Sequence, residues 1–461
     1  MEQYDVVIIG GGPGGYVAAI KSAQSGLRTA LVEKHKLGGV CLNYGCIPTK
    51  TMLKTAKLYQ EILNSDEFGI DISSKESIKV DWTKLMKRKD KVVSTLVSGV
   101  KSLLSKNKVD VYIGTGVSKP SKIIDVDGIE IGYDNLILAT GSRNRIPEIR
   151  GIMKSIEDGH IIDSTGAVSL EFLPESLTIL GGGVISVEFA TLFASLGTKV
   201  TILQRSKELL KKLDFDVRKL IMDDLNEKGI VLKTGVSIEE LEGKKVKYKE
   251  DGVFQEISSD KILLSLGRMP NVEGFENLGI DYSPKGVVTN EKMETSVKNV
   301  YAIGDMNGTF MLAHVASHEG IIAIENILGK DEKVDYDKIP NCIYSFPEVG
   351  TVGYTEDELM EKNMDYIVSK FPLTANGKAL AEGEAKGFVK ILADKKYGEI
   401  LGVHIVAAHG TDMIAEAVAS MELEGTIYEL SKTVHPHPTL SEIVMEAAHG
   451  AVDKPIHIYK A

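Results

Sequence analysis

Hydrophobic and polar positions follow the same order in two separate parts of the chain. Apolar runs at residues 4–9 and 176–180 each lead into a glycine-rich segment, and a helical pattern follows each of them, the first from Tyr16. β-Branched runs come next, at residues 29–33 and 199–204. Strand, glycine turn, helix and strand in this order predict a βαβ unit of the size that binds a dinucleotide. The sequence therefore predicts two such units.

Other periodic segments fill the space between and after these units. A Lys-rich stretch at about residues 75–107 has a helical pattern, and short strands end in the run 135–141. Apolar runs at 261–266 and 299–303 lead into Gly267 and into Gly304-Asp305. These runs predict further strands.

The last part of the chain has a different pattern. Alternating runs at residues 387–393 and 399–406 flank a polar turn and predict a β-hairpin. A helical pattern follows, and its apolar face consists of Met413, Ile414, Ala417, Val418 and Met421. The predicted fold class is therefore α/β, with two Rossmann-like dinucleotide-binding domains and a C-terminal α+β domain.

Composition limits the class of protein. The 461 residues are 43% hydrophobic and 26% charged, which is typical of a globular protein of about three domains. The net charge of -11 argues against a nucleic-acid or anionic-membrane surface. No apolar run approaches the roughly 18 residues that span a bilayer, and no targeting segment is visible. We expect a cytoplasmic protein.

The first glycine-rich segment has a dinucleotide-binding fingerprint. Gly10, Gly12 and Gly15, with Gly14 beside them, follow a strand and precede a helix. Glycines allow a tight turn and let backbone N–H groups approach a pyrophosphate at the helix N-terminus. Glu33 ends the next strand, where a carboxylate accepts hydrogen bonds from ribose hydroxyls. The alternative is an ordinary glycine turn.

The second glycine-rich segment departs from this pattern. Gly181 and Gly183 are present, but Ser186 replaces the third glycine. The position that corresponds to Glu33 is Gln204, and Arg205 follows it. An acid at this position favours the ribose 2′-OH of NAD, whereas a neutral residue beside a cation also tolerates the 2′-phosphate of NADP. A solvated basic segment is the third explanation.

Two of the three cysteines lie close together. Cys41 and Cys46 are five positions apart, and the third cysteine is Cys342. On a regular helix their Cα atoms would be about 8 Å apart, whereas a disulfide needs roughly 4.4–6.8 Å. A bridge therefore requires a distorted turn, which Gly45 and Pro48 permit. A metal site and a pair of buried structural thiols are the alternatives.

Residues 38–50 resemble the redox-active signature of the pyridine nucleotide–disulfide oxidoreductases, and Leu42, Asn43 and Ile47 are most similar to its dihydrolipoamide dehydrogenase group. The resemblance implies a labile Cys41–Cys46 disulfide. In it, Cys41 exchanges with the dithiol substrate and Cys46 faces the flavin of FAD. It also implies that Lys50 lies beside the flavin and pairs with Glu188. Val40 and Tyr44 depart from the family pattern at positions without chemistry.

A second candidate centre lies near the C-terminus. His437 stands between two prolines and lies five positions before Glu442, as expected for a general base with an orienting carboxylate. The run from Thr439 to Glu442 also has the spacing of a helix capping box. The family resemblance implies that His437 and Glu442 reach across a two-fold interface to the cysteines of the partner. His435 is expected to be a supporting or exposed residue.

The resemblance extends to other segments. It implies that Asp305 accepts from the ribityl chain of FAD, that Ala313 belongs to the same contact segment, and that Thr140-Gly141 links the nucleotide domains. In NADP-using relatives such as glutathione reductase, an Arg falls where Arg205 lies. His314 and His318 are expected to be packing or surface residues, and Cys342 a buried thiol without a partner.

These expectations combine into one hypothesis. The predicted domains are an FAD-binding domain, an NAD(P)-binding domain, a central segment that completes the FAD region, and an interface domain (residues 1–146, 147–269, 270–338 and 339–461). The resemblance implies a homodimer that oxidises the dihydrolipoamide of a lipoyl-bearing protein, from a 2-oxoacid dehydrogenase or glycine cleavage system, and reduces NAD or NADP. No metal is expected. The alternatives are a glutathione-reductase-like enzyme and a non-catalytic flavoprotein subunit.

Overall fold

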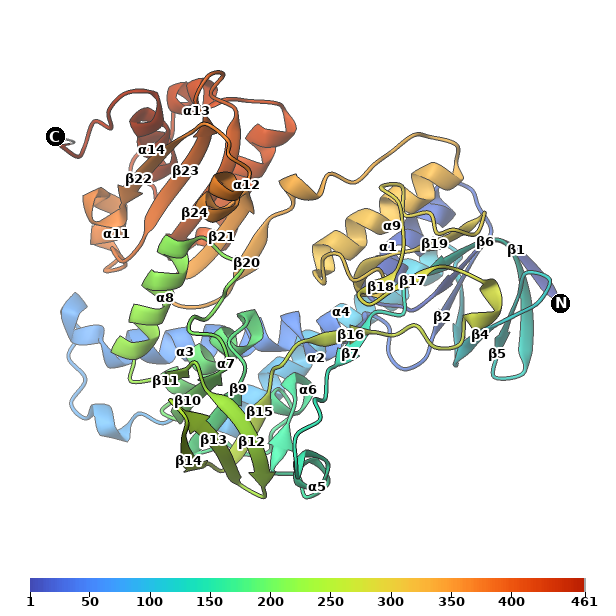
Figure 1. Cartoon of the computed structure of the whole chain (residues 1–461), viewed down its shortest axis with the longest axis horizontal. Coiled ribbons are helices and arrows are strands. Elements are labelled where there is room, and N and C mark those ends of the chain that lie inside the picture. Colours follow the sequence, from blue (N-terminus) through green and yellow to red (C-terminus); the bar gives the residue numbers. More distant parts are fainter. Residues whose placement is uncertain (460–461) are drawn as a thin grey trace.

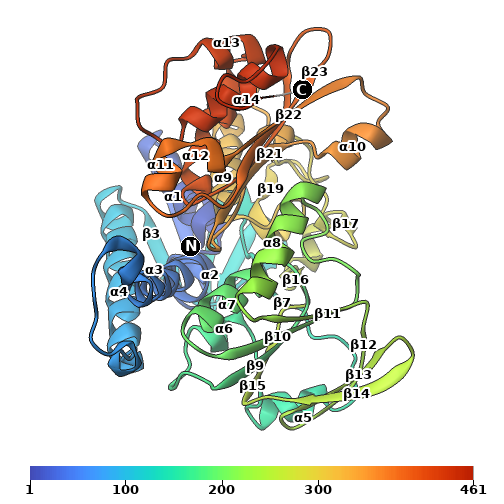
Figure 2. The ribbon, with the colours of Figure 1, turned by 90° about the vertical axis from the view of Figure 1, so that its left-hand side faces the viewer.

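The computed structural model describes residues 1–459 and has a mixed α/β fold. Three groups of elements stand apart in Figure 1: the sheet around β1, the sheet around β9, and the C-terminal sheet in orange and red. Figure 2 shows the C-terminal sheet above the other two. Within the described residues, no helix is both long enough and apolar enough to cross a bilayer.

The first sheet has seven strands, and the apolar run of β1 lies at its centre. β1 pairs in parallel with β2 on one side and with β6 on the other, and β6 also pairs with β19. Val6, Val7 and Ile8 have no exposed surface. Helical residues such as Ala18 and Leu104 pack against Val6 and Ile8 on one face, whereas strand and loop residues such as Ile124 and Phe275 pack with Val7 on the other. The strands are β1 (Glu2–Ile9), β2 (Thr29–Glu33), β3 (Asp110–Ile113), β4 (Gly116–Lys119), β5 (Ile123–Val126), β6 (Ile129–Leu138) and β19 (Val300–Ala302).

Five α-helices belong to this part of the chain. They are α1 (Pro13–Gln24), α2 (Gly39–Tyr44), α3 (Cys46–Leu63), α4 (Trp82–Lys106) and α9 (Ala313–Ile327). The predicted helix at 75–107 is confirmed from Trp82 onward, and Asp81 caps its N-terminus through the backbone N–H of Lys84. α1 begins three residues before the predicted Tyr16, because Pro13 is tolerated in the first turn, where its missing N–H has no partner to lose.

The second sheet is parallel and repeats the arrangement around a second glycine turn. Its strand order is β11-β10-β9-β15-β8, and α7 follows β9. The strands predicted at 176–180 and 199–204 have the predicted bounds, whereas the strand at 261 ends two residues early. The elements are β8 (Ile161–Ile162), β9 (Ser176–Leu180), α7 (Val184–Ser195), β10 (Lys199–Gln204), α8 (Phe215–Glu227), β11 (Val231–Thr234) and β15 (Lys261–Leu264).

Small elements flank this unit. An antiparallel three-stranded sheet lies at its margin, and β7 pairs with β16 in the two segments that connect the nucleotide units. The two-stranded ladder of β17 and β18 lies beside the first sheet instead, where Val287 packs with Tyr4 and Leu136. These elements are β12 (Ser237–Glu242), β13 (Lys245–Glu250), β14 (Val253–Ser258), β7 (Ser142–Asn144), β16 (Arg268–Pro270), α5 (Ile152–Glu157), α6 (Ser164–Ala167), β17 (Tyr282–Ser283) and β18 (Gly286–Val287).

The C-terminal sheet is antiparallel, with the order β20-β21-β24-β23-β22. The predicted hairpin is confirmed as β23 and β24, and Met413, Ile414 and Ala417 of the predicted helix are buried in its core. The elements are β20 (Asn341–Ile343), β21 (Glu348–Gly353), α10 (Glu356–Glu361), β22 (Tyr366–Pro372), α11 (Gly377–Ala381), β23 (Phe388–Asp394), β24 (Ile400–Ala407), α12 (Gly410–Glu422), α13 (Ile427–Lys432) and α14 (Glu442–Val452).

Candidate active site

A cavity of about 1890 Å³ extends along the three sheets, and residues of both glycine turns line it. Its walls also contain Cys41, Cys46 and Asp305. Pockets for a single small ligand measure roughly 300–1,000 Å³, so this cavity has room for more than one such ligand.

The first glycine turn lies at the carboxyl end of β1. Gly10 has a φ of +108°, and a Cβ there would lie 2.2 Å from the Ala139 carbonyl oxygen. A Cβ on Gly15 would lie 1.7 Å from the Gly10 carbonyl oxygen, so α1 and β1 approach too closely for a side chain. A Cβ on Gly12 would meet only Gly39, at 3.9 Å. The backbone before α1 therefore faces the cavity openly, as an anion site at a helix N-terminus requires.

Glu33 closes this turn from the end of β2. One carboxylate oxygen accepts the Gly11 N–H at 2.6 Å, and the other accepts the His35 N–H at 2.6 Å. The side chain is buried and lines the cavity. Each oxygen keeps a lone pair that can accept from a hydroxyl group.

The two cysteines flank a break between two helices. α2 ends at Tyr44 and α3 begins at Cys46, and Gly45 between them has the irregular angles φ −128° and ψ −105°. The predicted distorted turn is therefore present. It brings the two side chains close enough for each thiol to affect the acidity of the other. Both are free thiols in the structure, so the disulfide stays a prediction.

The two sulfurs differ in acidity. The hydrogen bond from Cys41 lowers the pKa of Cys46 to about 7, although burial opposes the charge and the Lys50 ammonium favours it. The same hydrogen bond, together with burial, raises the pKa of Cys41 far above the usual thiol range. The pair of thiols therefore loses one of its two protons near neutral pH, and the resulting negative charge lies mainly on Cys46.

Lys50 connects the cysteine helix to the second nucleotide unit. Its Nζ atom lies 2.8 and 2.7 Å from the two carboxylate oxygens of Glu188 on α7, so the pair implied by the resemblance is present. Glu188 also accepts the Tyr344 N–H at 3.1 Å, and Lys50 Nζ lies 4.4 Å from the centre of the Tyr344 ring. Tyr344 lines the cavity, and no sequence motif pointed to it.

The second glycine turn repeats the geometry of the first. Gly181 has a φ of +113°, and a Cβ there would lie 2.2 Å from the Ser265 carbonyl oxygen. A Cβ on Gly183 would meet no atom within 4 Å. Gln204 lines the cavity and donates through Nε2 to the Ser206 hydroxyl at 2.7 Å.

The basic residues that follow Gln204 differ in whether they line the cavity. Arg205 is exposed, and the cavity wall does not include it. Lys211 and Lys212 line the cavity instead. Arg205 stays a predicted nucleotide contact, and Lys211 and Lys212 are two further cations on the cavity wall.

A third group of residues lies where β19 and α9 meet the first glycine turn. Asp305 accepts a hydrogen bond from the Ser142 hydroxyl, and Ala313 begins α9. Thr140 Oγ1 donates to the Asn271 carbonyl oxygen at 2.6 Å, and Gly141 has a φ of +70°. All four positions line the cavity.

Glu319 of α9 holds the backbone next to Asp305, and no sequence motif pointed to it. It has no exposed surface, and it accepts the Gly304 N–H at 2.5 Å and the Tyr336 hydroxyl at 2.6 Å. Burial raises its pKa despite these hydrogen bonds. The available signal was a carboxylate at helical spacing from the apolar residues Val315, Ile322 and Ala323.

His437 and Glu442 lie together at the start of α14. His437 Nδ1 is 2.9 Å from Glu442 Oε1, while Glu442 Oε2 accepts the Thr439 N–H at 2.8 Å. Partial burial disfavours the Glu442 charge, but these two hydrogen bonds outweigh it and lower the pKa of Glu442. The Glu442 side chain thus makes both the contact expected for orienting the His437 imidazole and one half of the predicted capping box.

His437 does not lie in the cavity with the cysteines of its own chain. Its side chain is 79% exposed, and the cavity wall includes no residue between 435 and 442. His435, in contrast, is not exposed: its side chain is 5% accessible and its Nε2 lies 2.6 Å from Glu416.

The remaining histidines and the third cysteine have simpler surroundings. His314 Nε2 donates to the Pro340 carbonyl oxygen at 2.9 Å, and burial lowers the pKa of its imidazole. Cys342 is a half-buried thiol on the cavity wall, and burial raises its pKa to about 11.

Protein-family models match most of the chain. A model described as pyridine nucleotide-disulphide oxidoreductase matches residues 4–320. A second model, for the dimerisation domain of the same family, matches residues 339–448.

Proteins of similar sequence match over the full length. A dihydrolipoyl dehydrogenase from Mycoplasma genitalium is 41% identical over 454 residues, which are 98% of this chain and 99% of that protein. A dihydrolipoyl dehydrogenase from Bacillus subtilis is 41% identical over 477 residues, covering 99% of both.

Solved structures are also similar. The HOCl-induced flavoprotein disulfide reductase RclA from Escherichia coli has a TM-score of 0.85 and 28% identity, over 96% of this chain and 99% of that one. Its Cu(II) complex has a TM-score of 0.84 at the same identity, over 95% and 98%.

Proposed function

Because the chain belongs to the pyridine nucleotide-disulphide oxidoreductase family, we propose that it is a dihydrolipoyl dehydrogenase. It would oxidise the dihydrolipoamide of a lipoyl-bearing protein, from a 2-oxoacid dehydrogenase or glycine cleavage system in the cytoplasm, and reduce NAD⁺. The observation that carries the proposal is the acidic Cys46 thiol beside Cys41 and Lys50 in a cavity between two glycine turns. Relatives with this activity are 41% identical over nearly the whole chain.

Family members bind FAD and NAD(P), and the residues around the first glycine turn fit FAD. The open backbone at Gly12 suits the pyrophosphate, and Glu33 suits the ribose. Asp305, Ala313, Thr140 and Gly141 would hold the rest of the group. When bound, FAD would supply the two-electron chemistry that reoxidises the Cys41 and Cys46 thiols to the disulfide and connects them to the nicotinamide.

The sulfur chemistry follows from the acidity of the two thiols. A thiolate of dihydrolipoamide attacks the Cys41 sulfur of the Cys41–Cys46 disulfide, and Cys46 leaves as a thiolate. The second substrate thiol then displaces Cys41 and closes lipoamide. Two sulfurs of the substrate are thereby oxidised and two cysteine sulfurs reduced. Cys46 is the better leaving group, because a low-pKa thiolate leaves faster.

His437 would act as the base that removes the substrate protons. Its Nδ1 is held by Glu442, so Nε2 is the nitrogen that can accept a proton. Since His437 is exposed and is not part of the cavity wall of its own chain, the proposal requires a second copy of the chain to bring it to the cysteines. The match to the family dimerisation domain supports a homodimer.

The nucleotide remains to be assigned between NAD and NADP. Gln204 offers no carboxylate to the 2′-OH, while Lys211 and Lys212 line the wall near it. We propose NAD as the physiological partner, in line with the dihydrolipoyl dehydrogenase relatives. Steady-state rates with NAD⁺ and NADP⁺ test this choice, and a clear preference for NADP⁺ would favour a glutathione-reductase-like or RclA-like reductase.

The central test is the activity of a His437→Gln variant with dihydrolipoamide and NAD⁺. A positioned base contributes about 10²–10⁴-fold, so we expect a loss of this size. A loss of less than about threefold would reject the role. Cys46→Ser should abolish turnover, and native turnover by that variant would favour a non-catalytic flavoprotein subunit.

His457→Gln is the matched control. His457 is 69% exposed, and its Nδ1 lies 2.7 Å from Glu446 one turn further along α14. Loss of an exposed His–Glu pair on this helix, without loss of a base, should leave the rate near that of the parent protein. An equal effect of both variants would instead indicate damage to α14.

A further inference from the structure

The segment between β10 and α8 forms one wall of the second nucleotide site. Leu210, Lys211, Lys212 and Leu213 all line the cavity. The segment touches the second glycine turn directly, because the Leu210 N–H donates to the Gly182 carbonyl oxygen at 2.8 Å. Leu210 has a positive φ of 51°, a conformation that a leucine rarely adopts unless its surroundings hold it.

The segment is fixed at its far end by Asp214, which has no exposed surface. One Asp214 oxygen caps α8 through the Asp216 N–H at 3.0 Å. The other accepts the Glu356 N–H, at 3.2 Å, from the start of α10 in the C-terminal domain. Asp214 therefore joins the nucleotide wall to a different domain.

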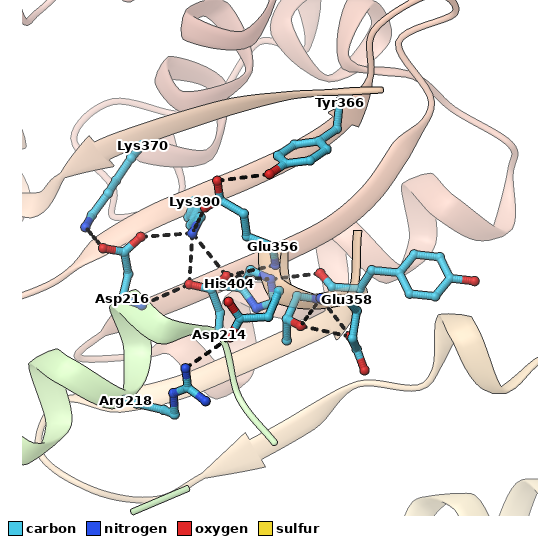
Figure 3. A network of polar contacts seen from close by, with 12 residues as sticks. Asp214, Asp216, Arg218, Glu356, Glu358, Tyr366, Lys370, Lys390 and His404 are labelled. Atoms are coloured by element: carbon cyan, nitrogen blue, oxygen red, sulfur yellow. Dashed lines mark hydrogen bonds and ion pairs between the residues drawn. The ribbon is translucent and has the colours of Figure 1, made fainter. Parts of the chain in front are cut away.

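Lys390 of β23 completes this link, and Figure 3 shows it at the centre of the network. Its side chain is 1% exposed, and its Nζ atom lies 2.9 and 3.0 Å from the Asp214 oxygens. It also donates to Asp216 at 2.9 Å and to Glu356 at 2.6 Å. These carboxylates raise the pKa of Lys390 against the effect of burial, so the lysine stays charged.

Arg218 holds the middle of the segment in the same way. One of its guanidinium nitrogens donates to the Lys211 carbonyl oxygen at 3.1 Å. Another donates to Asp357 of α10 at 3.1 Å. The middle and the far end of the wall are thus tied to α10 and β23 of the C-terminal domain by charged groups.

Such a buried network is a poor source of stability. Taking the charges out of water costs about as much as their attraction returns, and apolar residues of similar volume often stabilise a fold equally well. Ion pairs do, however, fix geometry, because directional hydrogen bonds accept one arrangement. The network is therefore better explained by what it positions than by the stability it adds.

We propose that Asp214 and Lys390 are positioning residues for the pyridine nucleotide: they hold the wall at Leu210–Leu213 from the C-terminal domain, so that nucleotide affinity depends on how that domain is docked. The proposal rests on nucleotide binding at the second glycine turn, a property of the family, and not on the identity of the dithiol substrate.

The test measures binding of ADP-ribose to the FAD-loaded dimer by titration calorimetry. ADP-ribose has the adenosine and pyrophosphate but no redox chemistry, so the result is independent of turnover. The main variant is Asp214→Asn with Lys390→Met, because Lys390→Met alone would leave a buried charge unpaired and could prevent folding. We expect about tenfold weaker binding, within the range by which distant residues alter coupling between sites. In turnover, KM for the nucleotide should rise while KM for the dithiol stays unchanged.

Lys386→Met is the matched control. Lys386 also links the C-terminal domain to α8, through Asp224 at 2.8 Å and Glu227 at 2.6 Å, but at the end of the helix away from the nucleotide wall. The affinity of the Lys386→Met variant for ADP-ribose should stay within about twofold of that of the parent protein. An equal loss in this variant would mean that general domain docking is responsible, and would overturn the proposal.

Glu356→Gln decides the question if the double variant does not fold. Glu356 is 26% exposed and glutamine keeps an acceptor for Lys390, so the fold should persist. A loss of at least about twofold in ADP-ribose affinity supports the proposal. Unchanged affinity in this variant, or in a folded double variant, refutes it.

Discussion

Replacing Cys41 by alanine should raise the pKa of Cys46, because the Cys41 thiol is the leading cause of its acidity. The structure lowers the Cys46 pKa from 9.0 to about 7. At roughly 1.4 kcal/mol per unit, this shift is worth about 3 kcal/mol. Without the hydrogen bond, burial and Glu188 oppose the charge, while Lys50 and a backbone hydrogen bond favour it. The pKa should return to 9 or above, and the thiolate fraction at pH 7 should fall from about one half to about one hundredth.

The assay is a pH titration of the ultraviolet thiolate absorbance of the reduced protein. A Cys342→Ser background removes the third thiol, whose pKa of about 11 would otherwise overlap the upper end of the titration. Cys41→Ser is the matched control, since its hydroxyl can still donate to the Cys46 sulfur and should keep the pKa within about one unit of the parent. If Cys41→Ala titrated near 7 like the parent, the hydrogen-bond explanation would be wrong.

Three further predictions concern the fold and its dependence on pH. Gly15→Ala places a Cβ 1.7 Å from the Gly10 carbonyl oxygen and should lower both Tm and the FAD bound per chain, measured by flavin absorbance. Gly99→Ala, in α4 with no atom within 4 Å of the new Cβ, should instead stabilise the protein by about 0.5–1 kcal/mol in urea denaturation. The native pKa of Glu442 lies below its ordinary 4.5, so its contribution to stability is present above that pH and disappears as pH falls through the native pKa. The difference in unfolding free energy between the parent and Glu442→Gln should therefore shrink towards zero in acid.

The order of apolar, polar and glycine residues was sufficient to predict several strands and the break between the two cysteines. The strands at 29–33, 176–180 and 199–204 have the predicted bounds, because β-branched runs bounded by glycine leave little choice. The break at Gly45 was also predictable, since a regular helix cannot bring Cys41 and Cys46 together. The bounds that shifted lie where a residue tolerates either state, as Pro13 does at the start of α1.

Contacts between distant segments could not be predicted in this way. Tyr344 reaches Lys50, and Lys390 reaches Asp214, across 294 and 176 positions (344 − 50 and 390 − 214). Neither pair has a spacing that a periodic pattern could reveal. Arg205 is a similar case: it follows Gln204 in the sequence, but it is exposed and does not line the cavity, whereas Lys211 and Lys212 do.

The ion pair of Lys50 and Glu188 couples the charge near the Cys46 sulfur to the second nucleotide unit, which has no part in the sulfur chemistry. Lys50 belongs to the helix of Cys46, while Glu188 belongs to the helix after the second glycine turn. A small rotation of one nucleotide unit against the other would change how much of the lysine charge Glu188 neutralises. The pKa of Cys46 would change as a result. The reactivity of this sulfur would therefore depend on the orientation of the second nucleotide unit.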